Sequence, residues 1–139
     1  MTEVVAYIDG GSRGNPGPAG FGVRIEDGRG RVIAELHSPL GVATNNVAEY
    51  RALLAALAFL VRGRHQVAHI RSDSELLVKQ MRGEYRVKHP GLVPLHREAL
   101  ALASRLQRVT YQHIRRAEND EADRLANLAM DEAGSTPAP

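Results

Sequence analysis

The stretch EVVAYIDGGSRGNPGPAGFGVRIEDGRGRVIAELHS, residues 3–38, sets the expected fold because three strand-like runs follow one another closely within it. Two glycines end the first run, and the Gly- and Pro-rich segment Ser12–Gly20 predicts a loop. The sequence DGRG after the second run is typical of a hairpin turn. The three runs are Glu3–Asp9, Phe21–Glu26 and Arg31–Ser38. Short connections of this kind predict a three-stranded antiparallel meander.

Helical and strand-like patterns alternate through the rest of the chain. Residues 47–61 carry apolar side chains at the three- and four-residue spacing of one helix face. Further helices are expected over residues 73–81, 94–107 and 118–133, and further strands over residues 66–72 and 109–114. The order β-β-β-α-β-α-α-β-α predicts an α/β fold with a mixed sheet, in which strands 1–3 are antiparallel and crossovers add strands 4 and 5 in parallel.

The 139 residues predict one domain over residues 1–133, followed by a flexible tail or linker start, GSTPAP, over residues 134–139. The chain has no cysteine, which excludes disulfides and thiolate metal sites. No apolar run reaches the roughly 18 residues of a membrane span. No basic leader precedes the first strand, so we expect a cytoplasmic protein.

The formal net charge of +2 does not by itself indicate a nucleic-acid partner. The distribution of charge is more informative, because basic side chains gather within one connection and its flanks. They are Lys79, Arg82, Arg86, Lys88, His89, His96 and Arg97. Such a cluster either contacts phosphates or is a solvated surface.

Four acidic residues occupy unusual places: Asp9, Glu49, Asp73 and Asp123. Each one alone can be explained as a turn former or as an acid that suits the start of a helix. Converging carboxylates repel one another, however, unless a divalent cation binds between them. Oxygen ligands suit Mg²⁺ or Mn²⁺, and such a cluster can hold two ions about 3.5–4 Å apart. The pattern therefore indicates a metal site for phosphodiester chemistry.

The stretch HIRRAENDEAD, residues 113–123, crowds four acids and two arginines into eleven residues. We expect Asn119 or Asp120 to cap the last helix. Glu118, Asp120 and Glu121 suit solvent and the positive end of the helix dipole. That leaves Asp123 as the acid with a chemical role.

Four ordered motifs resemble type I ribonuclease H over about residues 3–133. They are YIDGGSRGNPGPAGFG, TNNVAEYRALLAAL, RSDSELLVKQMRGEY and AENDEADRLANLA. The resemblance implies a five-stranded mixed sheet with helices on both faces. It also implies an endonuclease that hydrolyses the RNA strand of an RNA–DNA hybrid and leaves 3′-hydroxyl and 5′-phosphate ends. The metal-binding tetrad of the family matches Asp9, Glu49, Asp73 and Asp123, which implies two Mg²⁺ ions with substrate bound and Mn²⁺ as a substitute.

Substrate-binding residues follow from the same resemblance. Asn15, Asn45 and Asn46 match polar residues that face the minor groove of the hybrid, and the backbone at Gly10 and Gly11 can approach the RNA. Thr44 matches a residue at a pocket for a phosphate of the DNA strand, although capping the helix is an equal alternative. Arg86 and Lys88 are expected to contact the DNA strand.

The chain departs from the family in two places. The loop Arg115–Glu118 lacks a histidine that many members carry, so Arg115 or Arg116 is a candidate to stabilise charge or help product leave. His113 is expected to be a structural residue of the last strand. The segment Arg82–Pro94 is shorter than the tryptophan-rich basic protrusion of some members, which predicts weaker and more salt-sensitive binding. A monomeric domain is expected.

Three alternatives compete with a hybrid ribonuclease. A different nuclease or integrase-like enzyme of the same fold is disfavoured by the GNPGP and TNN motifs, which match the hybrid-binding parts. A non-catalytic nucleic-acid-binding module is disfavoured by the complete set of four acids. A domain whose acids serve only as caps would show no affinity for divalent ions.

Overall fold

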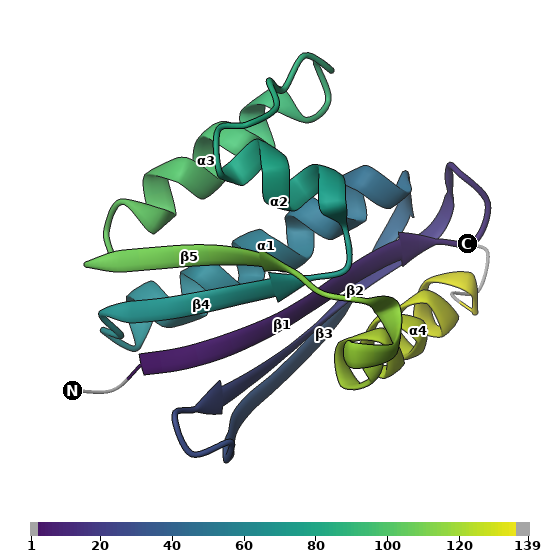
Figure 1. The fold of residues 1–139 in the computed structure, drawn as a ribbon. Helices are drawn as coiled ribbons and strands as arrows, with labels where there is room; N and C mark the ends of the chain where they lie inside the picture. The colour runs from purple at the N-terminus through teal and green to yellow at the C-terminus, as the bar shows by residue number, and fades with distance from the viewer. Residues whose placement is uncertain (1–2, 136–139) are drawn as a thin grey trace.

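The computed structural model describes residues 3–135, which form one five-stranded sheet in the order β3-β2-β1-β4-β5 (Figure 1). The strands are β1 (Glu3–Ser12), β2 (Gly17–Asp27), β3 (Val32–Ala43), β4 (Val67–Ser72) and β5 (Arg108–His113). The helices are α1 (Asn45–Arg62), α2 (Glu75–Met81), α3 (Val93–Ala103) and α4 (Asp120–Gly134). β1, β2 and β3 pair antiparallel, whereas β4 is parallel to β1 and β5 is parallel to β4. The expected α/β fold is confirmed.

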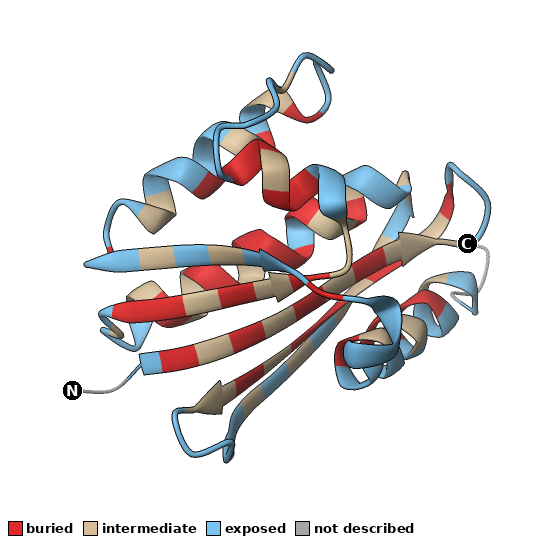
Figure 2. Ribbon diagram, in the orientation of Figure 1, coloured by how far each residue is buried: buried red, intermediate tan, exposed pale blue. Residues whose placement is uncertain are grey.

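Helices cover both faces of this sheet, as expected. α1 packs on β1 and β2 and is covered in turn by α3, while α4 lies on the opposite face over β1, β2 and β3 (Figure 1). Alternate residues of β1 explain the arrangement: Val4, Ala6 and Ile8 are buried in the core shared with α1 (Figure 2). The intervening residues point to the face of α4, and Asp9 is one of them.

α4 lies very close to β2 because glycines of the strand meet small residues of the helix. A Cβ atom at Gly22 would lie 2.5 Å from the carbonyl oxygen of Ala122 and from the amide nitrogen of Ala126. Such distances leave no room for a side chain, so the glycine determines how deeply the helix sits. Gly22 pairs with Asp9 across the two strands. The depth of α4 on the sheet therefore also determines how near α4 comes to Asp9.

The first connection is shorter than the sequence predicts. The expected loop Ser12–Gly20 contracts to residues 13–16, because β1 continues to Ser12 and β2 already begins at Gly17. Gly11 and Ser12 pair with Gly20 and Ala19, so the ladder extends through residues that are usually turn formers. β3 likewise extends beyond Ser38 to Ala43.

Several helix boundaries differ from the expected ranges, and α1, for example, begins at Asn45 and not at residue 47. α2 begins at Glu75 and not at residue 73, because the Ser74 side chain accepts a hydrogen bond from Leu77 N and caps the helix there. α3 ends at Ala103, four residues before the expected end. A 3₁₀ turn over Arg116–Glu118 precedes α4, which begins at Asp120 and not at residue 118.

The expected tail is partly helical, since α4 continues through Gly134 and the Ser135 amide donates to the Asp131 carbonyl oxygen. Residues 136–139 of the expected tail lie outside the described part of the chain. Within residues 3–135, no helix combines the length and the apolarity that crossing a membrane requires.

Candidate metal centre

Three carboxylates meet at one end of the sheet. Asp9 in β1, Glu49 in the first turns of α1 and Asp73 after β4 each offer an oxygen, and these oxygens all lie within 4.8 Å of one another. β1 and β4 are parallel neighbours, with Ile8 paired to Ser72. Asp9 and Asp73, which follow these two residues, therefore lie side by side. The predicted convergence of these three acids is thus present in the structure.

Gly10 allows α1 to bring Glu49 into the same cluster. A Cβ atom at this position would lie 2.3 Å from the Ala48 carbonyl group and 2.6 Å from the Glu49 amide nitrogen. No other residue type could let the start of α1 approach β1 this closely. Gly10, which is predicted to approach RNA, is therefore also needed for the packing of α1 on β1. Gly11 is under no such constraint, because a Cβ atom there would come no nearer than 3.5 Å to the Met130 side chain.

Asp123 lies beside the three-carboxylate cluster and not within it. Its carboxyl group shares a hydrogen bond with Asp9, and Arg116 Nη2 lies 4.0 Å from its Oδ1. Its side chain is 35% exposed, so it borders solvent more than a fully enclosed ligand would. Asp123, Arg116 and the three clustered acids line one cavity of about 410 Å³.

The electrostatics of the cluster favour a bound cation. Burial raises the pKa of Asp9 to about 8, with the nearby carboxyl groups of Asp73, Asp123 and Glu49 contributing to that rise. Burial likewise raises the pKa of Glu49 to about 7, against a hydrogen bond from Ser74 that lowers it. The pKa of Asp73 is raised by burial, although a hydrogen bond from Asn119 opposes that rise. Oxygen donors held this close suit Mg²⁺ or Mn²⁺, whose charge would stabilise the ionised acids.

Asn15 and Asn45 form a hydrogen-bonded pair beside the acids. Asn15 Oδ1 accepts a hydrogen bond from the backbone N–H of Asn45 at 3.0 Å, and Asn45 Oδ1 accepts one from the backbone N–H of Ser12 at 2.8 Å. Both side-chain oxygens are therefore used inside the protein. Their NH₂ groups, which are donors only, are left to face solvent.

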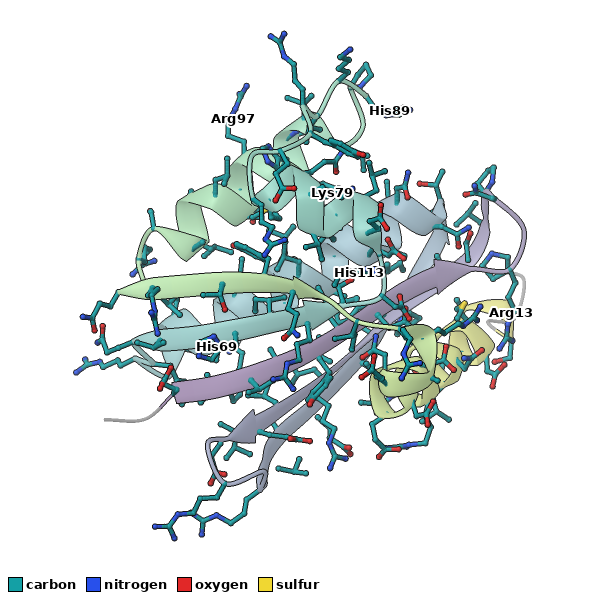
Figure 3. The ribbon with its side chains drawn as sticks, viewed as in Figure 1. Arg13, His69, Lys79, His89, Arg97 and His113 are labelled. Carbon is teal, nitrogen blue, oxygen red and sulfur yellow. The ribbon has the colours of Figure 1, made fainter. Side chains whose placement is uncertain are left out.

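The remaining predicted substrate residues form a second group. Asn46, Arg86 and Lys88 line a separate cavity of about 500 Å³ together with Tyr85. This cavity lies at the α2–α3 connection, where Figure 3 shows the labelled His89. Thr44 caps α1, since its Oγ1 accepts from the Val47 amide at 3.2 Å. The capping role of Thr44 is therefore realised, and its hydroxyl hydrogen remains available to a ligand.

The two candidate arginines differ in position. Arg116 lines the acid cavity, whereas Arg115 Nε is paired with Glu118 Oε1 at 3.3 Å outside it. His113 lies in β5, as predicted, and its exposed side chain is that of the last residue of the strand (Figure 3). It also acts to lower the pKa of Asp73, so it contributes to the field of the cluster.

Sequence reasoning assigned no role at the site to two asparagines, although it expected Asn119 as a possible cap of the last helix. Asn119 occupies the cap position of α4, but its side chain does not cap the helix and donates instead to the Ile8 carbonyl oxygen. Asn127 Nδ2 donates to the Asp123 carbonyl oxygen, while its Oδ1 accepts from Arg13, which also pairs with Asp131 (Figure 3). The partners of these asparagines are remote in sequence or lie one helical turn away, so no local pattern identifies them.

Similarities to known proteins agree with this geometry. The family model described as "Reverse transcriptase-like" matches residues 7–129. The Bifunctional protein Rv2228c of Mycobacterium tuberculosis is 49% identical over 137 residues, which are 98% of this chain and 38% of that protein. The structure of its N-terminal RNase H domain, solved as a fusion with maltose binding protein, has a TM-score of 0.95 at 48% identity and covers 99% of this chain and 100% of that chain.

Two further relatives carry the comparison beyond that protein. Ribonuclease HI of Halobacterium salinarum is 42% identical over 131 residues, which are 94% of this chain and 66% of that protein. The crystal structure of LC11-RNase H1 in complex with an RNA/DNA hybrid has a TM-score of 0.88 at 42% identity and covers 95% of this chain and 99% of that one. The chain thus spans well under half of the mycobacterial relative and about two thirds of the archaeal one. By these similarities the chain belongs to the type I ribonuclease H family.

Proposed function

We propose that the chain is an endoribonuclease that hydrolyses the RNA strand of RNA–DNA hybrids with the help of divalent cations. The observation that carries the proposal is the convergence of Asp9, Glu49 and Asp73 within 4.8 Å, with Asp123 hydrogen-bonded beside them. Buried acids that raise one another's pKa are costly unless they serve a site. The names of relatives at 42–48% identity support the same chemistry.

The acids would hold Mg²⁺, as two ions when substrate is bound, with Mn²⁺ as a substitute. Bound ions would supply positive charge that polarises the scissile phosphate and lowers the pKa of the attacking water. Attack of water on phosphorus with departure of the 3′ oxygen leaves 3′-hydroxyl and 5′-phosphate ends. Arg116, at the rim of the cavity, donates to a phosphate oxygen and cannot act as a general base.

The paired asparagines would recognise the minor groove of the hybrid. Because their oxygens are used internally, Asn15 and Asn45 present NH₂ donors, which suit base-edge acceptors and the lone pairs of a 2′-hydroxyl. The backbone of Gly10 and Gly11 lines the acid cavity with no side chain in the way, and the RNA strand would lie there. The 2′-hydroxyl would mark the strand to be cut.

The DNA strand would meet the second cavity. Asn46, Arg86 and Lys88 line it, and the two cations can contact phosphates there. Thr44 keeps a donor hydrogen although its oxygen caps α1, so both roles that the sequence allows are compatible. A monomeric domain in the cytoplasm, joined in a longer protein to a further domain, completes the proposal.

Cleavage of a strand-labelled RNA–DNA hybrid tests the function. With Mg²⁺ or Mn²⁺, the RNA strand should be cut to 5′-phosphate ends, while duplex RNA and duplex DNA remain intact. Asp73→Asn should abolish cutting and retain binding of the hybrid. Binding without cutting by the unmodified chain would identify a non-catalytic module instead, and cleavage of duplex DNA would identify a different nuclease.

A further inference from the structure

Asn119 is the residue near the acids whose burial is hardest to explain by stability. It is 1% exposed at the start of α4, where a side chain would ordinarily cap the helix. Its Oδ1 is buried and has no hydrogen-bond partner among residues 3–135. A buried polar atom left in this way destabilises the folded protein. Such a group in a native structure calls for an explanation.

The contacts of Asn119 connect its burial with the neighbouring acids. Its Nδ2 donates to the Ile8 carbonyl oxygen at 2.8 Å, one residue before Asp9. A carbonyl oxygen only accepts, so the orientation of the amide follows from this bond. The side chain also interacts with the Asp73 carboxyl group, whose pKa it acts to lower. Its backbone carbonyl oxygen accepts from the Asp123 amide at 3.0 Å.

We propose that Asn119 is a positioning residue that fastens the segments bearing Asp9, Asp73 and Asp123 into a metal-binding arrangement. The inference rests on the proposed metal site. The three acids belong to β1, to the junction after β4 and to α4. Asn119 bonds to β1 next to Asp9, interacts with Asp73 and immediately precedes the helix that carries Asp123. Acids in one cluster repel one another, so a tie between their segments is needed before a cation arrives.

A neutral amide suits this position better than a cation would. A lysine or arginine bonded to Asp73 would neutralise the carboxylate and compete with the metal for it. Asn119 interacts with Asp73 without neutralising it and so leaves its negative charge available. Residues that orient metal ligands in this way typically affect metal affinity strongly when they are changed.

The test compares Asn119→Ala and Asn119→Ser with Gln80→Ala. Gln80 is a matched control because it is also a buried amide, 6% exposed, whose Oε1 accepts from the Tyr50 hydroxyl at 2.6 Å in the core. Mg²⁺ is titrated into each metal-free protein, and NMR follows the backbone amides of Gly10 and Gly11. The KM for the hybrid is measured separately at saturating Mg²⁺.

Both Asn119 variants should bind Mg²⁺ about tenfold or more weakly than the unmodified protein, with the KM for the hybrid unchanged. Gln80→Ala should melt at a lower temperature but bind Mg²⁺ normally, which separates positioning from general destabilisation. Unaltered Mg²⁺ affinity in Asn119→Ala would overturn the inference. An unmodified protein that binds no Mg²⁺ would instead overturn the proposed function.

A spectroscopic signature decides the question even if both Asn119 variants fail to fold. In the unmodified protein, the side-chain NH₂ resonances of Asn119 should shift when Mg²⁺ is added, because this amide interacts with the proposed metal ligand Asp73. NH₂ resonances that do not respond to saturating Mg²⁺ would contradict the inference.

Discussion

At the scale of single residues, Asp9 lies where burial and three neighbouring carboxyl groups all disfavour its ionised form. Its pKa of about 8 and that of Glu49 near 7 exceed the ordinary values of 3.8 and 4.5. The folded, metal-free protein therefore binds more protons at these two acids than the unfolded chain does between about pH 4 and pH 8. Its free energy of unfolding must then fall as the pH rises through that window.

We expect the melting temperature of the metal-free protein to fall by more than about 4 °C between pH 5.5 and pH 8.5. On the proposed function Mg²⁺ would bind the ionised acids, so it should raise the melting temperature more at pH 8.5 than at pH 5.5. Asp9→Asn removes the largest of these shifts and should flatten the decline, while abolishing cleavage. Asp120→Asn, at an exposed position, should leave the pH profile as it is.

A metal-free protein that gains stability towards pH 8.5 would contradict this account. Calorimetry or melting followed by circular dichroism measures all three proteins.

The two arginines of the loop before α4 are expected to differ in function because only Arg116 reaches the acid cavity. Arg116→Ala should lower kcat about tenfold or more, the effect of one charged hydrogen bond to the phosphate. Arg115→Ala, which breaks only the exposed pair with Glu118, should leave kcat unchanged. Single-turnover cleavage of the hybrid measures both. Equal rates for the two variants would remove Arg116 from the reaction.

At the scale of elements, the positions of the acids depend on two close helix–sheet contacts. α1 approaches β1 at Gly10 and thereby brings in Glu49, and α4 approaches β2 at Gly22 and thereby brings Asp123 near Asp9. The two helices approach from opposite faces of the sheet (Figure 1). The carboxylate cluster is therefore assembled by packing, and any change that lifts either helix should separate the acids.

Gly22→Ala tests this dependence, because its Cβ would lie 2.5 Å from the backbone of α4. We expect a loss of about 2–3 kcal/mol in the free energy of unfolding from overpacking, together with a lower kcat as Asp123 moves. Gly28→Ala is the control, since its Cβ would meet only the Glu3 carbonyl oxygen at 3.6 Å. Urea unfolding measures both variants. Equal stability in the two would mean that α4 is free to adjust.

At the scale of the whole molecule, the cations expected to bind phosphates of the DNA strand are set apart from the acids. The cavity lined by Arg86 and Lys88 lies at the α2–α3 connection, whereas Arg108 lies at the opposite end of the sheet, at the start of β5. A hybrid bound across the acid cavity and this connection would place phosphates of the DNA strand near Arg86 and Lys88 but not near Arg108. Binding should then depend on salt through a small number of ion pairs.

Replacing Arg86 and Lys88 together by alanine should reduce the slope of log K against log salt by about two, because two phosphates would no longer be neutralised by the protein. The Mg²⁺ requirement and kcat at saturating hybrid should not change, because neither residue touches the acids. Arg108→Ala should leave the slope unchanged. Fluorescence anisotropy with a labelled hybrid, using Ca²⁺ to prevent cleavage, measures the slopes. A slope that Arg108→Ala changes as much would indicate non-specific attraction.

The sequence by itself determined the order of the elements, the mixed sheet and the identity of the acids. Periodicity and turn residues are local, so Glu3–Asp9 and residues 47–61 could be assigned without knowledge of their partners. Boundaries shifted where a partner strand or a cap decided them, as at Ser12 and at Ser74. The family motifs then located the four acids within the chain, since each motif is a short continuous segment.

Only the tertiary structure decided how those residues act on one another. It separated Asp123 from the cluster of Asp9, Glu49 and Asp73, and it placed Arg116 in the cavity and Arg115 outside. It also turned Asn119 from an expected cap into a buried tie to Ile8, a partner 111 residues away. Burial and contacts across such separations depend on how the helices pack on the sheet, and no local pattern in a sequence records that packing.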